Sequence, residues 1–264
     1  MVVPKKSLSQ HFLRDDNIVR KIVASLAPKP SDAILEIGPG RGVLTRQIWQ
    51  QVRHFVAVEV DDQAIALLRE LFGPALTILR QDVREVRLAS LASEYQSAIR
   101  VVGNIPYHIT SDILFWLFDQ QQQVADATLM LQFEVARRLT AEAGGKEYGI
   151  LSVVARLFSE PALLFRVSPH CFWPEPSVES AVVRLDFRTD VPAHDHRLFR
   201  AIVRGTFGKR RKMLSTSLKH MGFRDQNLRQ VTLDLHRRPE DLALEEFLEL
   251  TRQLEPYRDQ LQDA

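Results

Sequence analysis

Ala33-Ile34-Leu35-Glu36-Ile37-Gly38-Pro39-Gly40-Arg41-Gly42 is a short apolar run that leads directly into a glycine-rich turn. The apolar part predicts a buried strand, and the glycines let a ligand approach the backbone beyond its end. Comparable apolar runs predict further strands at 55–60, 76–79 and 99–103. Because helical patterns separate these runs, we predict an α/β fold with a parallel sheet covered by helices on both faces.

The rest of the chain continues this alternation and then changes character. A first helix, capped by Asp15 or Asp16, should end before Pro28. Other helices are expected at 42–50, 62–72, 110–118, 133–142 and 148–158, and strands at 127–131, 162–167 and 178–187. The last two strands should pair around the loop 168–177.

After Asp190-Val191-Pro192 the pattern is purely helical, with helices expected at 198–207, 213–221 and 242–254. We therefore predict a domain over residues 1–190, which starts with a basic arm, and a small all-helical domain over 191–264.

Composition limits the class of protein. With 264 residues, of which 45% are hydrophobic, the chain can bury a sizeable core. No apolar stretch approaches the roughly 18 residues of a transmembrane helix, and the N-terminus lacks the apolar core of a signal peptide. The single cysteine, Cys171, cannot form an internal disulfide and fits a reducing compartment. We expect a cytoplasmic protein with no membrane partner.

The net charge of +2 conceals a strong segregation of charge. Twelve Lys and Arg residues lie between Arg197 and Arg238, and eight acids follow from Glu240 onward. The run Lys209-Arg210-Arg211-Lys212 is the densest part and predicts a surface that binds nucleic-acid phosphates. A solvated helix face is the alternative interpretation.

Polar residues stand at the carboxyl ends of the predicted strands, where α/β sheets bind their ligands. Glu59 ends the second strand, and its carboxylate can accept both hydroxyls of a ribose. Asp82 follows the third strand and can accept a hydrogen bond from an adenine amino group. Each acid, taken alone, is equally compatible with an ordinary surface position.

Asn104-Ile105-Pro106-Tyr107 follows the fourth strand and is the most informative motif. It brings together an amide oxygen, rigidly held carbonyls and an aromatic face, which suits a flat base with an exocyclic amino group. The set is poorly suited to hydride transfer, phosphoryl transfer or metal chemistry. An ordinary turn is the alternative, because Asn and Pro are common turn residues.

The glycine loop discriminates between cofactors. In a dinucleotide motif, G-x-G-x-x-G, the third glycine would fall where Val43 stands. A glycine loop, two strand-end acids and Asn104–Tyr107, in this order, fit S-adenosylmethionine better than a nicotinamide cofactor. The eight histidines are scattered, and we expect no metal site.

Several further motifs extend over nearly the whole chain: Ser9–Leu13, Glu36–Gly42, Met130–Val135 with Arg138-Leu139, Tyr148–Val153, Phe172–Ala181, Phe207–Leu214 and Arg238–Glu240. Together with Asn104–Tyr107, they resemble the motifs of the KsgA-type dimethyladenosine transferases of small-subunit ribosomal RNA. The resemblance implies a Rossmann-like class I methyltransferase sheet with S-adenosylmethionine as cofactor. It also implies a monomer that methylates N6 of two adjacent adenosines near the 3′ end of 16S rRNA in the immature small subunit.

The resemblance also implies roles for single residues. The implied cofactor contacts are His11, Leu13, Gly38, Gly40, Glu59, Asp82 and Asn104. Asn104, with the carbonyl of Ile105 or Pro106, would accept the hydrogens of the target amino group, while Tyr107 and Phe172 would stack on the base. Lys209, Arg210, Arg211 and Lys212 would bind RNA.

The chain departs from the family pattern at four positions. His11 and His108 stand where Asn is frequent, and Phe133 and Ser177 stand where Lys is common. The last two departures remove positive charge near the expected RNA side.

Three other functions remain open at this level. The first is a nicotinamide-dependent oxidoreductase, and the second is a non-catalytic RNA-binding or assembly factor that keeps the fold. The third is a large-subunit rRNA methylase of the macrolide-resistance type, which shares Asn-Ile-Pro-Tyr. Tyr148–Val153 and the basic run favour the small-subunit enzyme.

Overall fold

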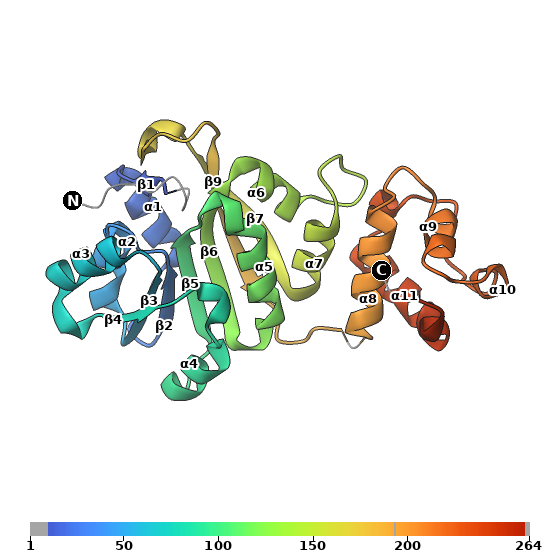
Figure 1. Ribbon diagram of the computed structural model, residues 1–264, viewed down its shortest axis with the longest axis horizontal. Coiled ribbons are helices and arrows are strands. Elements are labelled where there is room, and N and C mark those ends of the chain that lie inside the picture. The colour runs from blue at the N-terminus through green and yellow to red at the C-terminus, as the bar shows by residue number, and fades with distance from the viewer. Residues whose placement is uncertain (1–9, 193, 262–264) are drawn as a thin grey trace. The chain divides into compact units, whose positions relative to one another are not determined.

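The structure is a computed structural model that describes residues 10–192 and 194–261 (Figure 1). It divides the chain into two compact units. The first contains Met1–Ala136 and Phe158–Thr189, and the second contains Arg137–Leu157 and Asp190–Ala264. None of the helices within the described residues is long and apolar enough to cross a membrane.

A seven-stranded sheet with the order β4-β3-β2-β5-β6-β9-β7 forms the centre of the first unit. Its parallel strands are β2 (Ala33–Ile37), β3 (His54–Glu59), β4 (Thr77–Arg80), β5 (Ile99–Asn104) and β6 (Val124–Gln132). Two antiparallel strands complete it, β9 (Ser180–Phe187) beside β6 and β7 (Ser159–Val167) at the edge. The predicted parallel sheet and the predicted pairing of the two late strands are confirmed.

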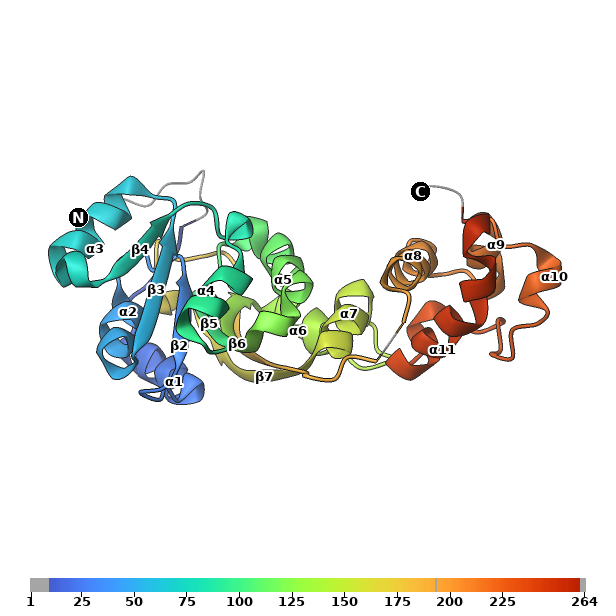
Figure 2. The same ribbon diagram turned by 90° about the horizontal axis from the view of Figure 1, so that it is seen from below.

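Helices cover both faces of this sheet, as predicted (Figure 2). One face carries α1 (Asp16–Leu26), α2 (Val43–Ile48) and α3 (Asp62–Phe72), whose apolar side chains pack against alternate residues of the strands. The other carries α4 (Leu88–Tyr95) and α5 (Thr110–Asp119). Asp15 caps α1 by accepting hydrogen bonds from the backbone of Asn17 and Ile18. The sequence analysis did not predict α4.

A small two-stranded sheet was also not predicted. In it, β1 (Phe12–Leu13) pairs antiparallel with β8 (Phe172–Trp173). Phe12 and Leu13, which were assigned to a basic arm, are buried. Residues 10–14 therefore belong to the packed unit, and residues 1–9 of the predicted arm lie outside the described part of the chain.

The second unit is helical. It contains α7 (Ile150–Phe158) up to Leu157, α8 (His196–Phe207), α9 (Leu214–His220), α10 (Asp225–Leu228) and α11 (Leu244–Leu254), while α6 (Phe133–Thr140) starts in the first unit. Short 3-10 helices lie at Trp49–Gln51, Gly73–Ala75, Val83–Glu85, Tyr107–Ile109, Gln121–Gln123, Pro169–Cys171, Pro239–Asp241 and Glu255–Gln260.

Residues 137–157 group with the C-terminal residues, although the sequence analysis placed them in the first domain. The Tyr148 hydroxyl donates a hydrogen bond of 2.9 Å to the Leu242 carbonyl, and its ring packs against that of Phe207. The Gly144 amide donates to the Glu240 carbonyl at 2.7 Å. The assignment of 191–264 as a ribosome-binding domain stays a prediction.

Candidate active site

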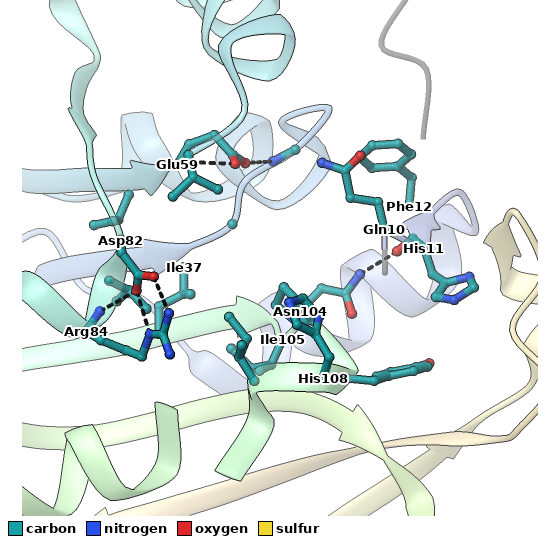
Figure 3. A pocket seen from close by; sticks show the side chains of 18 of the residues that line it. Gln10, His11, Phe12, Ile37, Glu59, Asp82, Arg84, Asn104, Ile105 and His108 are labelled. Atoms are coloured by element: carbon teal, nitrogen blue, oxygen red, sulfur yellow. Dashed lines mark hydrogen bonds and ion pairs between the residues drawn. The ribbon is translucent and has the colours of Figure 1, made fainter. Parts of the chain in front are cut away.

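A cavity of about 240 Å³ lies beyond the carboxyl ends of the central parallel strands (Figure 3). Sequence segments that are far apart meet in its wall, as the predicted position of the site requires. Predicted site residues that line it are His11, Gly38, Gly40, Glu59, Asp82, Asn104, Pro106 and Tyr107. Two predicted site residues, Leu13 and Phe172, are not among the lining residues.

The glycine loop approaches the N-terminal segment closely. Gly40 has a φ of +54°, which residues with a side chain rarely adopt. A Cβ atom at this position would lie 2.9 Å from the ring of Phe12. Glycine is therefore needed here both for the turn and for the contact with Phe12.

Glu59 is almost fully buried and is held by the backbone. Its carboxylate accepts hydrogen bonds from the amides of Gly40 (3.2 Å), Val60 (2.8 Å) and Asp61 (2.9 Å). Burial raises the pKa of Glu59, and the backbone hydrogen bonds oppose that rise. Two of these bonds go to Oε1 and one to Oε2, so Oε2 keeps acceptor capacity for a ribose hydroxyl.

Asp82 is oriented by Arg84, whose role the sequence analysis missed. The Arg84 side chain donates to both carboxylate oxygens of Asp82, at 3.0 and 2.6 Å (Figure 3). It also donates to Asp112 at 3.1 Å. These hydrogen bonds lower the pKa of Asp82. Asp82 is therefore an ionised acceptor, as binding to an adenine amino group requires. In the sequence, the only indication of this contact is that Arg84 stands two residues after Asp82.

Asn104 has one side of its amide engaged. Its Nδ2 donates a 2.8 Å hydrogen bond to the carbonyl of His11, which leaves Oδ1 to accept from a ligand (Figure 3). The Pro106 carbonyl already accepts from Ile109 N and Thr110 Oγ1, both at 3.2 Å. No described residue donates to the carbonyl of Ile105.

The ring of Tyr107 is held from two sides. Its hydroxyl lies 2.7 Å from the Oγ of Ser180, a fully buried residue that the sequence analysis did not single out. The His11 imidazole stacks on the Tyr107 ring. Burial raises the pKa of Tyr107, so the hydroxyl stays protonated at neutral pH.

Phe172 does not lie where its predicted role requires. Only 1% of its surface is exposed, and its ring belongs to the hydrophobic core. Successive side chains of a strand point to opposite faces, so it is Trp173, 42% exposed, that points outward. Stacking of Phe172 on a base stays a prediction, and it requires the ring to move.

A second buried acid lies beneath the glycine loop. Glu36 is 2% exposed, and Thr45 Oγ1 donates a 2.6 Å hydrogen bond to its carboxyl. Burial raises the pKa of Glu36 to about 8. The sequence analysis quoted Glu36 within the loop motif but gave it no role. Within the described residues, no cluster of three His, Cys, Asp or Glu could hold a metal ion.

The predicted RNA-binding run divides into two kinds of residue. Lys209, Arg211 and Lys212 are exposed. Arg210 instead pairs with Glu240 and donates a 3.2 Å hydrogen bond to the Gly145 carbonyl. Its guanidinium therefore connects two segments of the second unit, which leaves the other three cations for phosphates.

Comparisons with known proteins identify the family of the chain. A family model described as ribosomal RNA adenine dimethylase matches residues 3–255. Ribosomal RNA small subunit methyltransferase A of Chlorobium phaeobacteroides is 43% identical over 259 residues, which cover 98% of this chain and 96% of that protein. The protein of the same name from Methylococcus capsulatus is 42% identical over 258 residues, covering 96% and 99%.

Solved structures show the same fold. A dimethyladenosine transferase from Plasmodium falciparum superposes with a TM-score of 0.82 at 24% identity, over 93% of this chain and 98% of that one. The 23S rRNA methyltransferase ErmE superposes with a TM-score of 0.71 at 25% identity, over 92% and 99%. The predicted Rossmann-like class I methyltransferase fold is confirmed.

Proposed function

The chain belongs to the ribosomal RNA adenine dimethylase family, and on that premise we propose that it methylates N6 of two adjacent adenosines near the 3′ end of 16S rRNA. The methyl donor would be S-adenosylmethionine, and the product N6,N6-dimethyladenosine. The substrate would be the immature small ribosomal subunit, on which the chain acts as a cytoplasmic monomer.

The orientation of the Asn104 amide carries this proposal. Because Nδ2 is held by the His11 carbonyl, Oδ1 faces the cavity as an acceptor. The Ile105 carbonyl is the second acceptor, since that of Pro106 is engaged within its own turn. Two acceptors beside an aromatic ring match the two hydrogens and the face of an adenine.

These acceptors address the chemical difficulty of the reaction. N6 of adenine is a weak nucleophile because its lone pair is delocalised into the ring, and it gains positive charge during attack. Asn104 Oδ1 and the Ile105 carbonyl stabilise that charge from fixed positions. Removal of the N6 proton needs no protein base. This proton becomes acidic once the methyl group has transferred, and it then leaves to water. The rest of the rate acceleration comes from holding N6 and the methyl donor in the correct relative orientation in the cavity.

The residues that line the cavity support this choice of cofactor. Glu59 Oε2 offers an acceptor for a ribose hydroxyl, and the ionised Asp82 offers one for the adenine amino group. S-adenosylmethionine supplies an electrophilic methyl group on a sulfonium when it is bound. Glu59 and Asp82 would hold its nucleoside part, and the glycine loop would allow its close approach.

The relatives support a small-subunit target over the large-subunit alternative. Those at 43% and 42% identity are named as small-subunit methyltransferases, whereas the large-subunit enzyme ErmE is 25% identical. The target base must leave its stack, which costs a few kcal/mol. Stacking on Tyr107 would offset part of that cost.

The test uses the purified chain, radiolabelled S-adenosylmethionine and small subunits from cells that lack the modification. We expect label in 16S rRNA and two adjacent primer-extension stops near its 3′ end, because a dimethylated N6 blocks pairing. Large subunits serve as the control and should stay unlabelled. Label confined to the large subunit, or stabilisation by a nicotinamide cofactor alone, would contradict the proposal.

A further inference from the structure

The exposed Trp173 has no role in the chemistry above. It follows the buried Phe172 in β8, and 42% of its surface is accessible. A tryptophan is costly to expose, and packing does not account for one that points away from the core. Exposed aromatic residues held in fixed positions are typical of binding surfaces.

Two partners fix the indole in place. Trp173 is the register partner of Phe12 in the β1–β8 pair, so the two rings lie side by side. The Arg41 guanidinium lies over both, 4.7 Å from the centre of the Phe12 ring and 4.8 Å from that of Trp173. Cation–π contacts of this kind stabilise the arrangement without covering the whole indole. With 42% of its surface accessible, Trp173 still has room for a ligand beside Arg41.

The same contacts tie the indole to the catalytic residues. Arg41 belongs to the glycine loop, in which Gly40 packs against Phe12. His11, next to Phe12, accepts the Asn104 hydrogen bond, and its Nδ1 lies 2.7 Å from the carbonyl of Pro174, next to Trp173. Trp173 is thus positioned by the elements that form the base site.

We propose that Trp173, held by Arg41, is a second stacking platform that binds an unpaired nucleobase next to the target adenosine. This inference rests on the proposed function. Single-stranded RNA is recognised mainly by stacking of splayed bases on aromatic rings. A base flipped into the cavity leaves its neighbour without a stacking partner, and the accessible surface of Trp173 provides one. The platform reads no particular base, because every base has a π-face.

The first test compares variants by steady-state kinetics on undermodified small subunits. In Trp173→Ala and Trp173→Leu, KM for the subunit should rise about 5- to 150-fold, the range expected for one lost base–aromatic stack. Trp173→Phe keeps a ring and should stay within about threefold of the wild type. KM for S-adenosylmethionine and the melting temperature should change little in all three.

Leu71→Ala is the matched control, since Leu71 is an exposed apolar residue of α3 with 43% of its surface accessible. It should leave KM for the subunit unchanged. A Trp173→Leu variant that folds and keeps the wild-type KM would overturn the proposal. So would an equal rise of KM in the Leu71 control.

Fluorescence gives a direct readout. Stacking of a base on Trp173 should quench tryptophan emission when subunit RNA fragments bind. In Trp173→Phe this quenching should be lost, although Trp49 and Trp116 still emit fluorescence. Unchanged quenching in Trp173→Phe would refute the platform. If the wild type itself methylates no adenine, the proposed function fails; if it methylates normally while Trp173 variants match it, only the platform fails.

Discussion

The imidazole of His11 stacks on the phenol ring of Tyr107, with ring centres 5.4 Å apart and planes at 26°. Tyr107 is the ring on which the target base is proposed to stack. A base inserted between two rings needs about 7 Å, or two stacking layers of about 3.4 Å. The base can therefore use this face of Tyr107 only after His11 has moved away, so that one stack is exchanged for another.

His11 should accordingly set part of the affinity for the subunit. In His11→Asn, the ring is absent and no stack must be broken, so KM for the subunit should fall severalfold at unchanged kcat. His11→Phe should stack more strongly and raise KM. Steady-state kinetics on undermodified subunits measures both effects, and equal KM values in the two variants would argue against the exchange.

Asn104→Ala should abolish most methyl transfer and leave the fold intact. Removing one fixed group that stabilises developing charge typically costs about 10²–10³ in kcat. Single-turnover incorporation of labelled methyl groups measures the loss, and binding of S-adenosylhomocysteine checks that the cavity survives. Incorporation at the wild-type rate would disprove the assignment of Asn104.

Lys212 and Arg211 should contribute to RNA affinity, whereas Arg210 should contribute to stability. The double change Arg211→Gln with Lys212→Gln should weaken subunit binding at low salt and reduce the slope of log affinity against log salt by about 2. Arg210→Gln is the informative control. It should lower the melting temperature, because Glu240 loses its partner. If Arg210→Gln alone removes the salt dependence, the division of roles is wrong.

Glu36 should make stability depend on pH. Burial raises its pKa from 4.5 to about 8, so between these values the folded chain holds a proton that the unfolded chain has lost. The stabilisation is complete below about pH 4.5 and is lost as pH rises through about 8, at up to about 1.4 kcal/mol per pH unit. Glu36→Gln keeps an acceptor for Thr45 and should flatten this decline, although Glu59 still contributes. Urea unfolding of the wild type and of Glu36→Gln from pH 5 to 8 tests this prediction. Equal slopes of unfolding free energy against pH in the two proteins would contradict it.

Arg100 should be the most sensitive charged residue for stability. Its guanidinium is largely buried and contacts the carboxylates of Asp32 and Asp126. Arg100→Met removes the ion-pair partner of Asp32 and leaves Asp126 with only the 3.6 Å contact to Arg184, which should cost about 3–5 kcal/mol in denaturant unfolding. The exposed pair of Arg80 and Asp62 provides the comparison, and Arg80→Ala should have almost no effect. Similar losses in both variants would show that the burial of Arg100 is unimportant.

Strands β2, β3, β5 and β6 could be predicted because each is a local run of mostly buried apolar residues, whereas no residue of β4 is buried and only its sequence pattern indicated a strand. The strand-end position of Glu59, Asp82 and Asn104 followed from that pattern alone. The β1–β8 pair could not be predicted, since strands of two residues carry no periodicity and their partners lie far apart in the sequence. For the same reason, nothing local indicated that Phe172 is buried while Trp173 is exposed.

Side-chain partners were equally inaccessible. A run of four cations gives no sign that Arg210 turns toward Glu240. Arg84 and Ser180 act on Asp82 and Tyr107 through contacts that only the folded chain creates. Sequence patterns thus predicted most of the residues that meet at the cavity, and tertiary contacts determine which of their polar groups are already engaged.

The grouping of residues 137–157 with the C-terminal residues has a consequence during synthesis. The Tyr148 hydroxyl must await the Leu242 carbonyl, 94 positions later in the chain. At a translation rate of about 5–20 residues per second, that delay lasts roughly 5–20 s. The Tyr148 ring waits for Phe207 and its hydroxyl for Leu242, so the nascent segment depends on residues that are synthesised later.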